Sequence, residues 1–420
     1  MYSLLIYHFF FYFVFLLYIT ITPTSCEPTD KIISIPSDLF LGSYYMFIQY
    51  GNRNQLVLLV INTESSYTTQ SRSLYSESQS KYLTSISKNV SFHLFNSNVT
   101  LYGDEYKDQC LFGEHYNITL PQFNMLLISE LKNFYHQVSN LAFAHKIPKE
   151  HHSIVYLLKK EGLINKRTFA LQQTKPESAM LYIGGTPPQV KESYQSYSLL
   201  TKVSDIHSIY WTIPISYIFI GEISYIYNNT YMRNYNEAYI SSSYNTFVPY
   251  TIMDFIIEEV FNEYIDRGEC MVNKYTKEVD CFYNKVNFVN NISFVIGDKA
   301  LNVDVGKMFQ CFNTTKCEFT IKAHSENKII IGLNIQMLYL VEYDYDQHSV
   351  EFSTKDENGI IDVDINILFP YKRIAKWGLI LSGVLFGLFI IKALSVSLKK
   401  RKIRRFERFE RFVEDFYNKV

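Results

Sequence analysis

The chain has 420 residues, of which 47% are hydrophobic, so it is long enough to build two units that each have a core. Its formal net charge is -1, and this near neutrality argues against a nucleic-acid partner. Tyr (35) and Phe (32) are both abundant, and we interpret this abundance as a bias of the encoding genome rather than as a binding surface.

The N-terminus carries an apolar block over residues 4–21, followed by small and polar residues up to Cys26. This order predicts a secretory signal peptide over residues 1–26. A basic segment ahead of the block is missing, so a signal anchor that is retained is the alternative.

An aliphatic run that starts at Leu56 breaks into the polar stretch Asn62-Thr63-Glu64-Ser65-Ser66. This pattern predicts a buried strand that delivers a short polar turn to a protected site. Further short strands are expected at residues 44–50, 90–95, 208–220 and 329–343, and helices at residues 153–161 and 250–265. The predicted class is mainly β.

Asn-x-Ser/Thr glycosylation sequons occur at Asn89, Asn98, Asn117, Asn228, Asn291 and Asn313. Four cysteines cluster in the C-terminal half, namely Cys270, Cys281, Cys311 and Cys317, whereas Cys110 is alone in the first half. In an oxidising compartment the four predict two disulfides, with three pairings open, and Cys110 is then a free thiol.

No cysteine spacing suggests zinc, and we expect neither a metal nor a cofactor. Glu150, His151 and His152, with His145 nearby, look like a metal cluster. They are interpreted instead as a solvated polar connection.

A second apolar segment over residues 377–398 has the length of a membrane-spanning helix. The basic tail at residues 399–420 begins with a run of lysines and arginines, which predicts a cytosolic tail and a single-pass type I membrane protein with its ectodomain in the lumen or outside. Gly383 and Gly387 permit dimerisation of the helix in the bilayer.

The turn at Asn62 resembles the catalytic Asp-Thr-Gly-Ser-Ser turn of the pepsin-like aspartic peptidases, with Asn62 in place of Asp and Glu64 in place of Gly. Tyr102-Gly103-Asp104 resembles the flap that closes over substrate. Residues 157–164 and 181–185 resemble the motifs Leu-x-x-x-Gly-Leu-Ile and Leu-x-Leu-Gly-Gly. Ser241 lies where the second catalytic aspartate belongs.

This ordered resemblance covers roughly residues 40–355 and implies a bilobal pepsin-like fold, with an N-terminal lobe at 40–195 and a C-terminal lobe at 196–358. It implies that Thr63 and Ser242 brace the two turns, with Glu64 and Ser243 completing them. It also implies a disulfide between Cys281 and Cys317. Glu64 is expected to point away from the cleft, because Gly in this turn supplies backbone freedom.

The family cleaves peptides with two aspartates that share one proton. The amide of Asn62 cannot accept a proton from water, and Ser241 has no base beside it in the sequence. The chain is therefore predicted to be a membrane-anchored, catalytically inactive homologue that binds an extended peptide or protein in its cleft. The alternatives are an active membrane-anchored aspartic endopeptidase and a structural or surface glycoprotein with a vestigial cleft.

Overall fold

The computed structural model describes most of the chain, and the ranges it describes are residues 31–40, 42–51, 55–72, 74–93, 100–113, 117–128, 139–146, 152–194, 197–221, 223–226, 237–282, 288, 290–311, 316–363 and 370–417. The predicted signal peptide lies outside these ranges. The chain divides into two units, residues 1–362 and residues 363–420. Both of the lobes expected at 40–195 and 196–358 fall inside the first unit.

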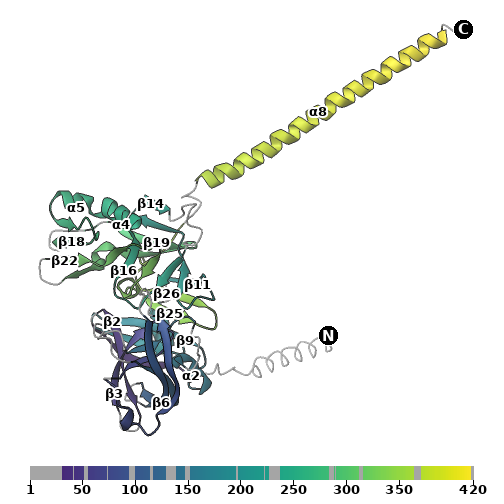
Figure 1. The fold of residues 1–420 in the computed structure, drawn as a ribbon. Coiled ribbons are helices and arrows are strands. Elements are labelled where there is room, and N and C mark those ends of the chain that lie inside the picture. Colours follow the sequence, from purple (N-terminus) through teal and green to yellow (C-terminus); the bar gives the residue numbers. More distant parts are fainter. Residues whose placement is uncertain are drawn as a thin grey trace, which may run out of the picture. The chain divides into compact units, whose positions relative to one another are not determined.

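The largest sheet of the first unit has 13 strands in the order β11-β26-β25-β9-β10-β1-β2-β3-β8-β4-β7-β6-β5. Figure 1 labels β2, β3, β6, β9, β11, β25 and β26 of this sheet. β2 also pairs with β6, so this end of the sheet closes on itself. Its strands are β1 Ile33–Phe40, β2 Ser43–Tyr50, β3 Gln55–Asn62, β4 Thr69–Ser71, β5 Thr84–His93, β6 Thr100–Phe112, β7 Ile118–Ile128, β8 Asn140–Ala142, β9 Thr168–Lys175, β10 Ser178–Ile183, β11 Tyr197–Lys202, β25 Leu340–Asp344 and β26 Ser349–Thr354.

Three smaller sheets come from the second half of this unit. One has the order β12-β15-β24-β16-β23, the next β14-β13-β19-β20-β27, and the last β17-β18-β22-β21. Their strands are β12 Thr212–Pro214, β13 Tyr217–Ile220, β14 Ile223–Ile226, β15 Glu237–Ile240, β16 Thr246–Pro249, β17 Cys270–Val272, β18 Val279–Phe282, β19 Asn291–Ile296, β20 Lys299–Asp304, β21 Phe309–Cys311, β22 Lys316–Phe319, β23 Ile321–His324, β24 Ile329–Ile331 and β27 Ile360–Asp362.

Both helices expected from the sequence are present. The first is α2 (Ile154–Lys160), which begins where the Ser153 side chain accepts a hydrogen bond from the N–H of Tyr156. The second is a continuous helical stretch whose parts are α4 Tyr250–Ile256, the π-helical η4 Ile257–Phe261 and α5 Asn262–Asp266. Shorter helices are η1 Glu77–Gln79, α3 Pro188–Tyr194, η6 Val305–Met308 and α6 Leu333–Gln336.

The strand expected over residues 329–343 is interrupted. β24 ends at Ile331, α6 follows, and only then does β25 begin. The strand expected over residues 208–220 is likewise split into β12 and β13. In both cases the apolar residues continue past the end of one strand and into the next element. Hydrophobicity alone therefore does not show where the strand ends.

One pairing pattern occurs twice in the first unit. In the first copy β3 runs parallel to β8, β8 is antiparallel to β4, and β4 is parallel to β7. In the second copy β15 is parallel to β24, β24 antiparallel to β16, and β16 parallel to β23. The two copies share a detail, because the hydroxyls of Thr68 and Thr246 accept the N–H groups of Ala142 and Gly332, respectively. The fold therefore contains an internal duplication of topology.

A cluster of buried aromatic rings contains residues from both halves of the first unit. The rings of Phe169 and Tyr343 stack with centroids 4.4 Å apart, and Trp211 packs edge-on against Tyr343 at 5.1 Å. The indole N–H of Trp211 donates to the carbonyl of Phe143 at 2.8 Å. Such pairs contribute about 0.5–1.5 kcal/mol each beyond their burial. The cluster joins residues of both halves into one core.

The four clustered cysteines lie on adjacent strands of the β17-β18-β22-β21 sheet and form two disulfides, Cys270–Cys281 and Cys311–Cys317. The pairing of Cys281 with Cys317 that the resemblance implied is therefore wrong. These two residues are register partners on β18 and β22, yet each bonds to its other neighbour across the sheet. Cys110 is a buried free thiol, as predicted.

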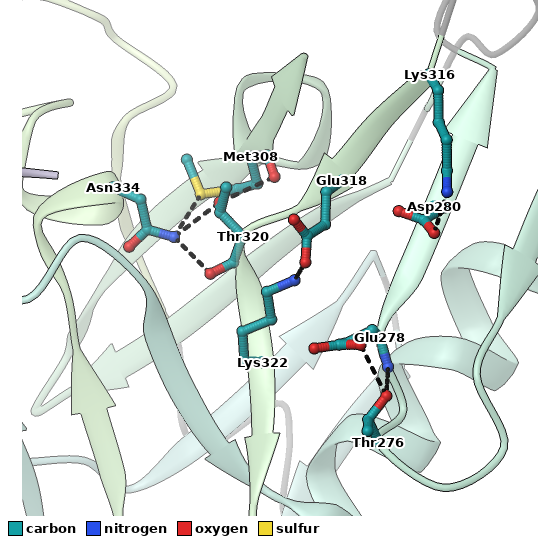
Figure 2. Close-up of polar contacts among 9 residues, drawn as sticks. All are labelled: Thr276, Glu278, Asp280, Met308, Lys316, Glu318, Thr320, Lys322 and Asn334. Carbon is teal, nitrogen blue, oxygen red and sulfur yellow. Dashed lines mark hydrogen bonds and ion pairs between the residues drawn. The ribbon is translucent and has the colours of Figure 1, made fainter. Parts of the chain in front are cut away.

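Charged and polar side chains pair with one another in and next to this disulfide-bonded sheet (Figure 2). Lys316 pairs with Asp280 of the neighbouring strand at 2.8 Å, and Lys322 pairs with Glu318. Asn334 directs its amide nitrogen toward Thr320 and the sulfur of Met308. Because the Asn334 amide oxygen also accepts from Thr246 Oγ1 at 2.6 Å, this network ties α6 to the second copy of the duplicated pattern.

The second unit contains the helix α8 (Pro370–Tyr417). Within the described residues, Leu381–Phe406 of this helix is a candidate membrane span, because it contains an 18-residue stretch with a mean hydropathy of 2.0. The predicted span over residues 377–398 overlaps this stretch. The basic run that follows continues the same helix without a break.

Candidate functional site

The first turn of the candidate site begins at the end of β3. The side-chain oxygen of Asn62 accepts the N–H groups of Glu64 and Ser65, at 2.8 and 2.9 Å. This is the local bonding that favours Asn in turns. The side-chain oxygen of Asn62 is therefore used to stabilise its own turn.

The second turn begins at the end of β15 and has the same local bonding. The Ser241 hydroxyl oxygen accepts the N–H of Ser243 at 2.9 Å, two residues further on, as Asn62 does for Glu64. The Ser241 N–H is held by the carbonyl of Ile331 at 2.9 Å. Asn62 and Ser241 thus occupy equivalent positions in the duplicated topology.

The two turns meet through Glu64. Its carboxyl accepts a hydrogen bond from the Ser241 hydroxyl and another from the backbone N–H of Ser242. The expectation that Glu64 points away from the cleft is therefore wrong, because its side chain reaches across to the second turn. Glu64 has no positive φ, so the backbone freedom of Gly is not needed at this position and a longer side chain can reach across.

The carboxyl of Glu64 has a strongly shifted pKa. Although the residue is only partly buried by surface area, desolvation by the surrounding protein raises its pKa to about 7 from the ordinary 4.5. The hydrogen bonds from Ser241 and Ser242 and the charge of Lys328 oppose this rise. No carboxylate contributes to the shift within the described part of the chain, so Glu64 does not belong to a coupled acidic pair there.

An aromatic pair and a lysine surround this contact. The charge of Glu64 adds to the burial that raises the pKa of Tyr210, whose ring packs edge-on against Tyr239 at 6.0 Å. The ammonium of Lys328 lies 5.3 Å from the centre of the Tyr239 ring and 2.5 Å from a carboxyl oxygen of Glu326. Sequence reasoning missed Lys328, because no local pattern connects it with residue 64.

The other residues of the expected turns have different roles. The Thr63 hydroxyl is buried and makes no hydrogen bond to any residue that the structure describes. Ser242 is buried and contributes its backbone N–H rather than a described side-chain bond. The link between the turns therefore falls to Glu64 and not to the hydroxyl brace that the resemblance implied.

Tyr102, the flap candidate, lies on β6 opposite Ser91 of β5, with 64% of its surface exposed. It makes no hydrogen bond or ring contact with the two turns in the described ranges. Gly103 beside it has no room for a side chain, since a Cβ there would come within 2.7 Å of the Leu127 carbonyl. The hairpin is therefore packed tightly against β7 at this point.

Histidines near the site are buried, and the interpretation of this region as a solvated connection is wrong for the two that the structure describes. His152 Nε2 lies 3.0 Å from the carboxyl of Glu105, and both side chains are fully buried. His145 is 6% exposed, and its Nε2 lies 2.9 Å from Nδ1 of His348. Glu150 and His151 lie outside the described residues. Partners distant in the sequence offset the burial of these polar rings.

Three sequon asparagines are described. Asn89 and Asn117 are exposed, and Asn291 is half-buried at the start of β19. Asn98, Asn228 and Asn313 lie outside the described residues. No cluster of three or more metal-ligating His, Cys, Asp or Glu side chains occurs in the described ranges.

No protein-family model matches this chain, and no curated protein matches it.

Proposed function

We propose that the chain is a pepsin-like aspartic peptidase homologue that is held in a membrane and binds an extended peptide without cutting it. The observation that carries this proposal is the contact of Glu64 with Ser241. The duplicated strand pattern supports the bilobal, pepsin-like interpretation, since it delivers Asn62 and Ser241 at equivalent ends of β3 and β15. Among the residues that the structure describes, one carboxyl, that of Glu64, lies between the turns, where the family would hold two.

The chemistry of peptide cleavage by this family needs an acid and a base at once. One carboxylate deprotonates the attacking water while the second, still protonated, donates to the scissile carbonyl. Glu64 can take either role but not both, and its partner Ser241 is a hydroxyl whose proton is already donated to it. Asn62 supplies neither a proton nor a base. The expected outcome is binding without turnover.

The membrane anchor in this proposal is α8, with the basic residues that follow the apolar stretch on the cytosolic side. The type I orientation predicts that added protease digests residues 31–362 from the lumenal or outer side only. It also predicts that an endoglycosidase shifts the mass of the protein. Neither effect is expected if the orientation is reversed.

The test uses the full-length chain in a neutral detergent. It is incubated with an unfolded protein from pH 3 to pH 7, with and without a statine-type inhibitor, and separately with an immobilised peptide library. Peptide binding without fragments is the expected result. Fragments whose formation the inhibitor blocks would overturn the proposal, and failure to bind any peptide would leave a surface glycoprotein as the better description.

A second candidate function follows from the same contact. A carboxyl with a pKa of about 7 that accepts a hydrogen bond from a serine hydroxyl can act as a general base for that serine. Ser241 Oγ would then attack a carbonyl while Glu64 takes its proton, and Glu64 would pass this proton to the amine or alcohol that leaves as its bond to the carbonyl carbon breaks and the acyl-enzyme forms. A fluorophosphonate probe that labels the wild type but not Ser241→Ala would favour this serine hydrolase over the binding protein.

A further inference from the structure

A dense group of cations follows the predicted membrane span in α8. All six of its members are exposed in the structure, and they are Lys399, Lys400, Arg401, Lys402, Arg404 and Arg405. The sequence places no acidic residue between Asp364 and Glu407, so positive charge dominates this part of the helix. The segment is therefore a candidate surface for a negatively charged partner.

The helical backbone distributes these cations around the whole axis. α8 runs from Pro370 to Tyr417 without a break (Figure 1). Successive residues of an α-helix are turned by about 100°, so six cations within seven positions face every side of the helix rather than one stripe. We call this segment, residues 399–405, the basic ring.

The basic ring lies at the depth of the lipid headgroups when residues 377–398 cross a bilayer. A helix rises about 1.5 Å per residue, so the ring occupies roughly the first 10 Å beyond Leu398. The hydrocarbon core is about 30 Å thick and the whole bilayer about 40–45 Å, which leaves a polar layer of roughly 5–8 Å on each side. The cations from Lys399 to Lys402 therefore fall within the layer that holds the lipid phosphates.

We infer that the basic ring binds a shell of anionic phospholipids in the leaflet beside it. The inference rests on the membrane anchor in the proposed function. Clusters of about four to eight Lys or Arg next to a membrane span are typical of segments that bind phosphatidylserine and phosphoinositides. Because the cations face every side of α8, no single headgroup can contact all of them. The ring therefore responds to the negative charge of the leaflet, and not to the stereochemistry of one headgroup.

The position of the ring favours lipids over a soluble anion as the partner. At physiological ionic strength exposed charges interact over about 8 Å. The lipid phosphates stay within this distance of Lys399–Lys402 as long as the helix is inserted. A soluble polyanion would have to displace that fixed negative surface.

The test measures lipid selectivity of the full-length chain reconstituted in phosphatidylcholine vesicles. Spin-labelled lipids are added one at a time, and electron paramagnetic resonance gives the fraction of each that the protein immobilises. Phosphatidylserine should associate about fivefold more strongly than phosphatidylcholine, which is the ratio for a lipid that meets about one cation of the ring. The preference should nearly vanish in about 1 M NaCl, because salt screens exposed charges.

Phosphoinositides separate a shell of lipids from a site for one headgroup. Two bisphosphate isomers of phosphatidylinositol carry the same charge and differ in the positions of their phosphates. Both should associate more strongly than phosphatidylserine, because their charge is larger, and they should do so equally. Selection of one isomer would show a stereospecific site and would contradict the shell.

Two matched double variants locate the surface along α8. Arg401→Gln with Arg404→Gln removes two cations of the ring, whereas Arg408→Gln with Arg411→Gln removes two exposed arginines at the same spacing further on. The second pair begins roughly 15 Å beyond Leu398, which is outside the polar layer. The first variant should lower the preference for phosphatidylserine to about threefold, and the second should leave it unchanged. Replacing all six cations by Gln should lower it below about twofold.

Insertion is measured separately, by flotation of the wild type and each variant with phosphatidylcholine vesicles after an alkaline wash. A wild type that does not float would overturn the membrane anchor of the proposed function together with this inference. A wild type that floats but shows no lipid preference, or equal losses in the two double variants, would overturn this inference alone. Saturable binding of inositol hexakisphosphate without any lipid preference would assign the ring to a soluble anion instead.

Discussion

The Ser241 hydroxyl donates a hydrogen bond to the Glu64 carboxyl across 177 positions of sequence. This bond joins the turn at the end of β3 to the turn at the end of β15, the two equivalent points of the duplicated strand pattern. It pairs an acid with a hydroxyl, so no proton is shared between two carboxyls. Glu64 is the group of this bond that titrates. Its protonation state therefore governs how strongly the hydrogen bond holds the two turns together.

Substitution of Glu64 by Gln should change how stability depends on pH. The folded-state pKa of Glu64 is raised to about 7, so the folded chain holds this proton more tightly than the unfolded chain. The resulting stability is complete below about pH 4.5 and is lost as the pH rises through about 7. Allowing for partial exposure of the group, the loss in the wild type should be about 1–3 kcal/mol. Urea unfolding of both proteins from pH 4 to pH 8 measures it.

The difference between the two proteins isolates Glu64, because every other titrating group is common to both. A difference in the free energy of unfolding that stays constant over this range would show that the pKa of Glu64 is not raised. Gln is the suitable replacement, since its amide oxygen can still accept from Ser241.

Rebuilding two acids at the turns should create peptidase activity if the proposed relationship is correct. The triple variant Asn62→Asp, Glu64→Gly, Ser241→Asp places an aspartate at each of the equivalent positions and removes the side chain that lies between them. Two close carboxyls split their pKa values and provide an acid and a base together. Cleavage of an unfolded protein with an acidic optimum, blocked by a statine-type inhibitor, is the expected result.

The matched controls are the double variants Asn62→Asp, Glu64→Gly and Glu64→Gly, Ser241→Asp, each of which removes the Glu64 carboxyl and still lacks one acid of the pair. Both should be inactive. A folded triple variant without activity would count against the interpretation of these turns as the remnants of a catalytic dyad.

Removing Glu105 should destabilise the first unit strongly. Its carboxyl is fully buried and accepts from Ser87 at 2.9 Å and Asn124 at 3.1 Å, besides its pairing with His152. Glu105→Ala would leave these buried groups without that acceptor. The expected loss is about 3–5 kcal/mol in the free energy of unfolding, measured with a chemical denaturant.

The exposed ion pair of Glu263 with Arg267 provides the control for this prediction. The two side chains are 78% and 47% exposed. Glu263→Ala should therefore cost less than about 1 kcal/mol, because solvent screens such pairs. Equal losses in Glu105→Ala and Glu263→Ala would mean that the buried network contributes nothing beyond a surface contact.

Peptide mapping without reduction should recover Cys270 joined to Cys281 and Cys311 joined to Cys317. The loops span 11 and 6 residues, so by the chain-entropy argument the bridges contribute about 3 and 2 kcal/mol. Replacing Cys270 and Cys281 by Ser should lower the thermal midpoint more than replacing Cys311 and Cys317. A peptide that joins Cys281 to Cys317 would contradict the structure.

The sequence alone determined the local features of the chain. The helix over residues 153–161, the helical periodicity over residues 250–265 and the apolar stretch within α8 each depend on neighbours a few positions away. Spacing and composition are therefore sufficient to predict them. The polar turn after β3 was identified for the same reason, since the strand and the turn residues are adjacent.

Only the tertiary structure decided which distant side chains meet. Glu64 reaches Ser241, His152 pairs with Glu105, and Cys281 bonds to Cys270 although Cys317 lies directly opposite on the other side. Each of these choices depends on the order of strands in a sheet and on which face a side chain occupies. Periodicity within one segment carries no information about either, because strand order is set by the packing of the whole unit.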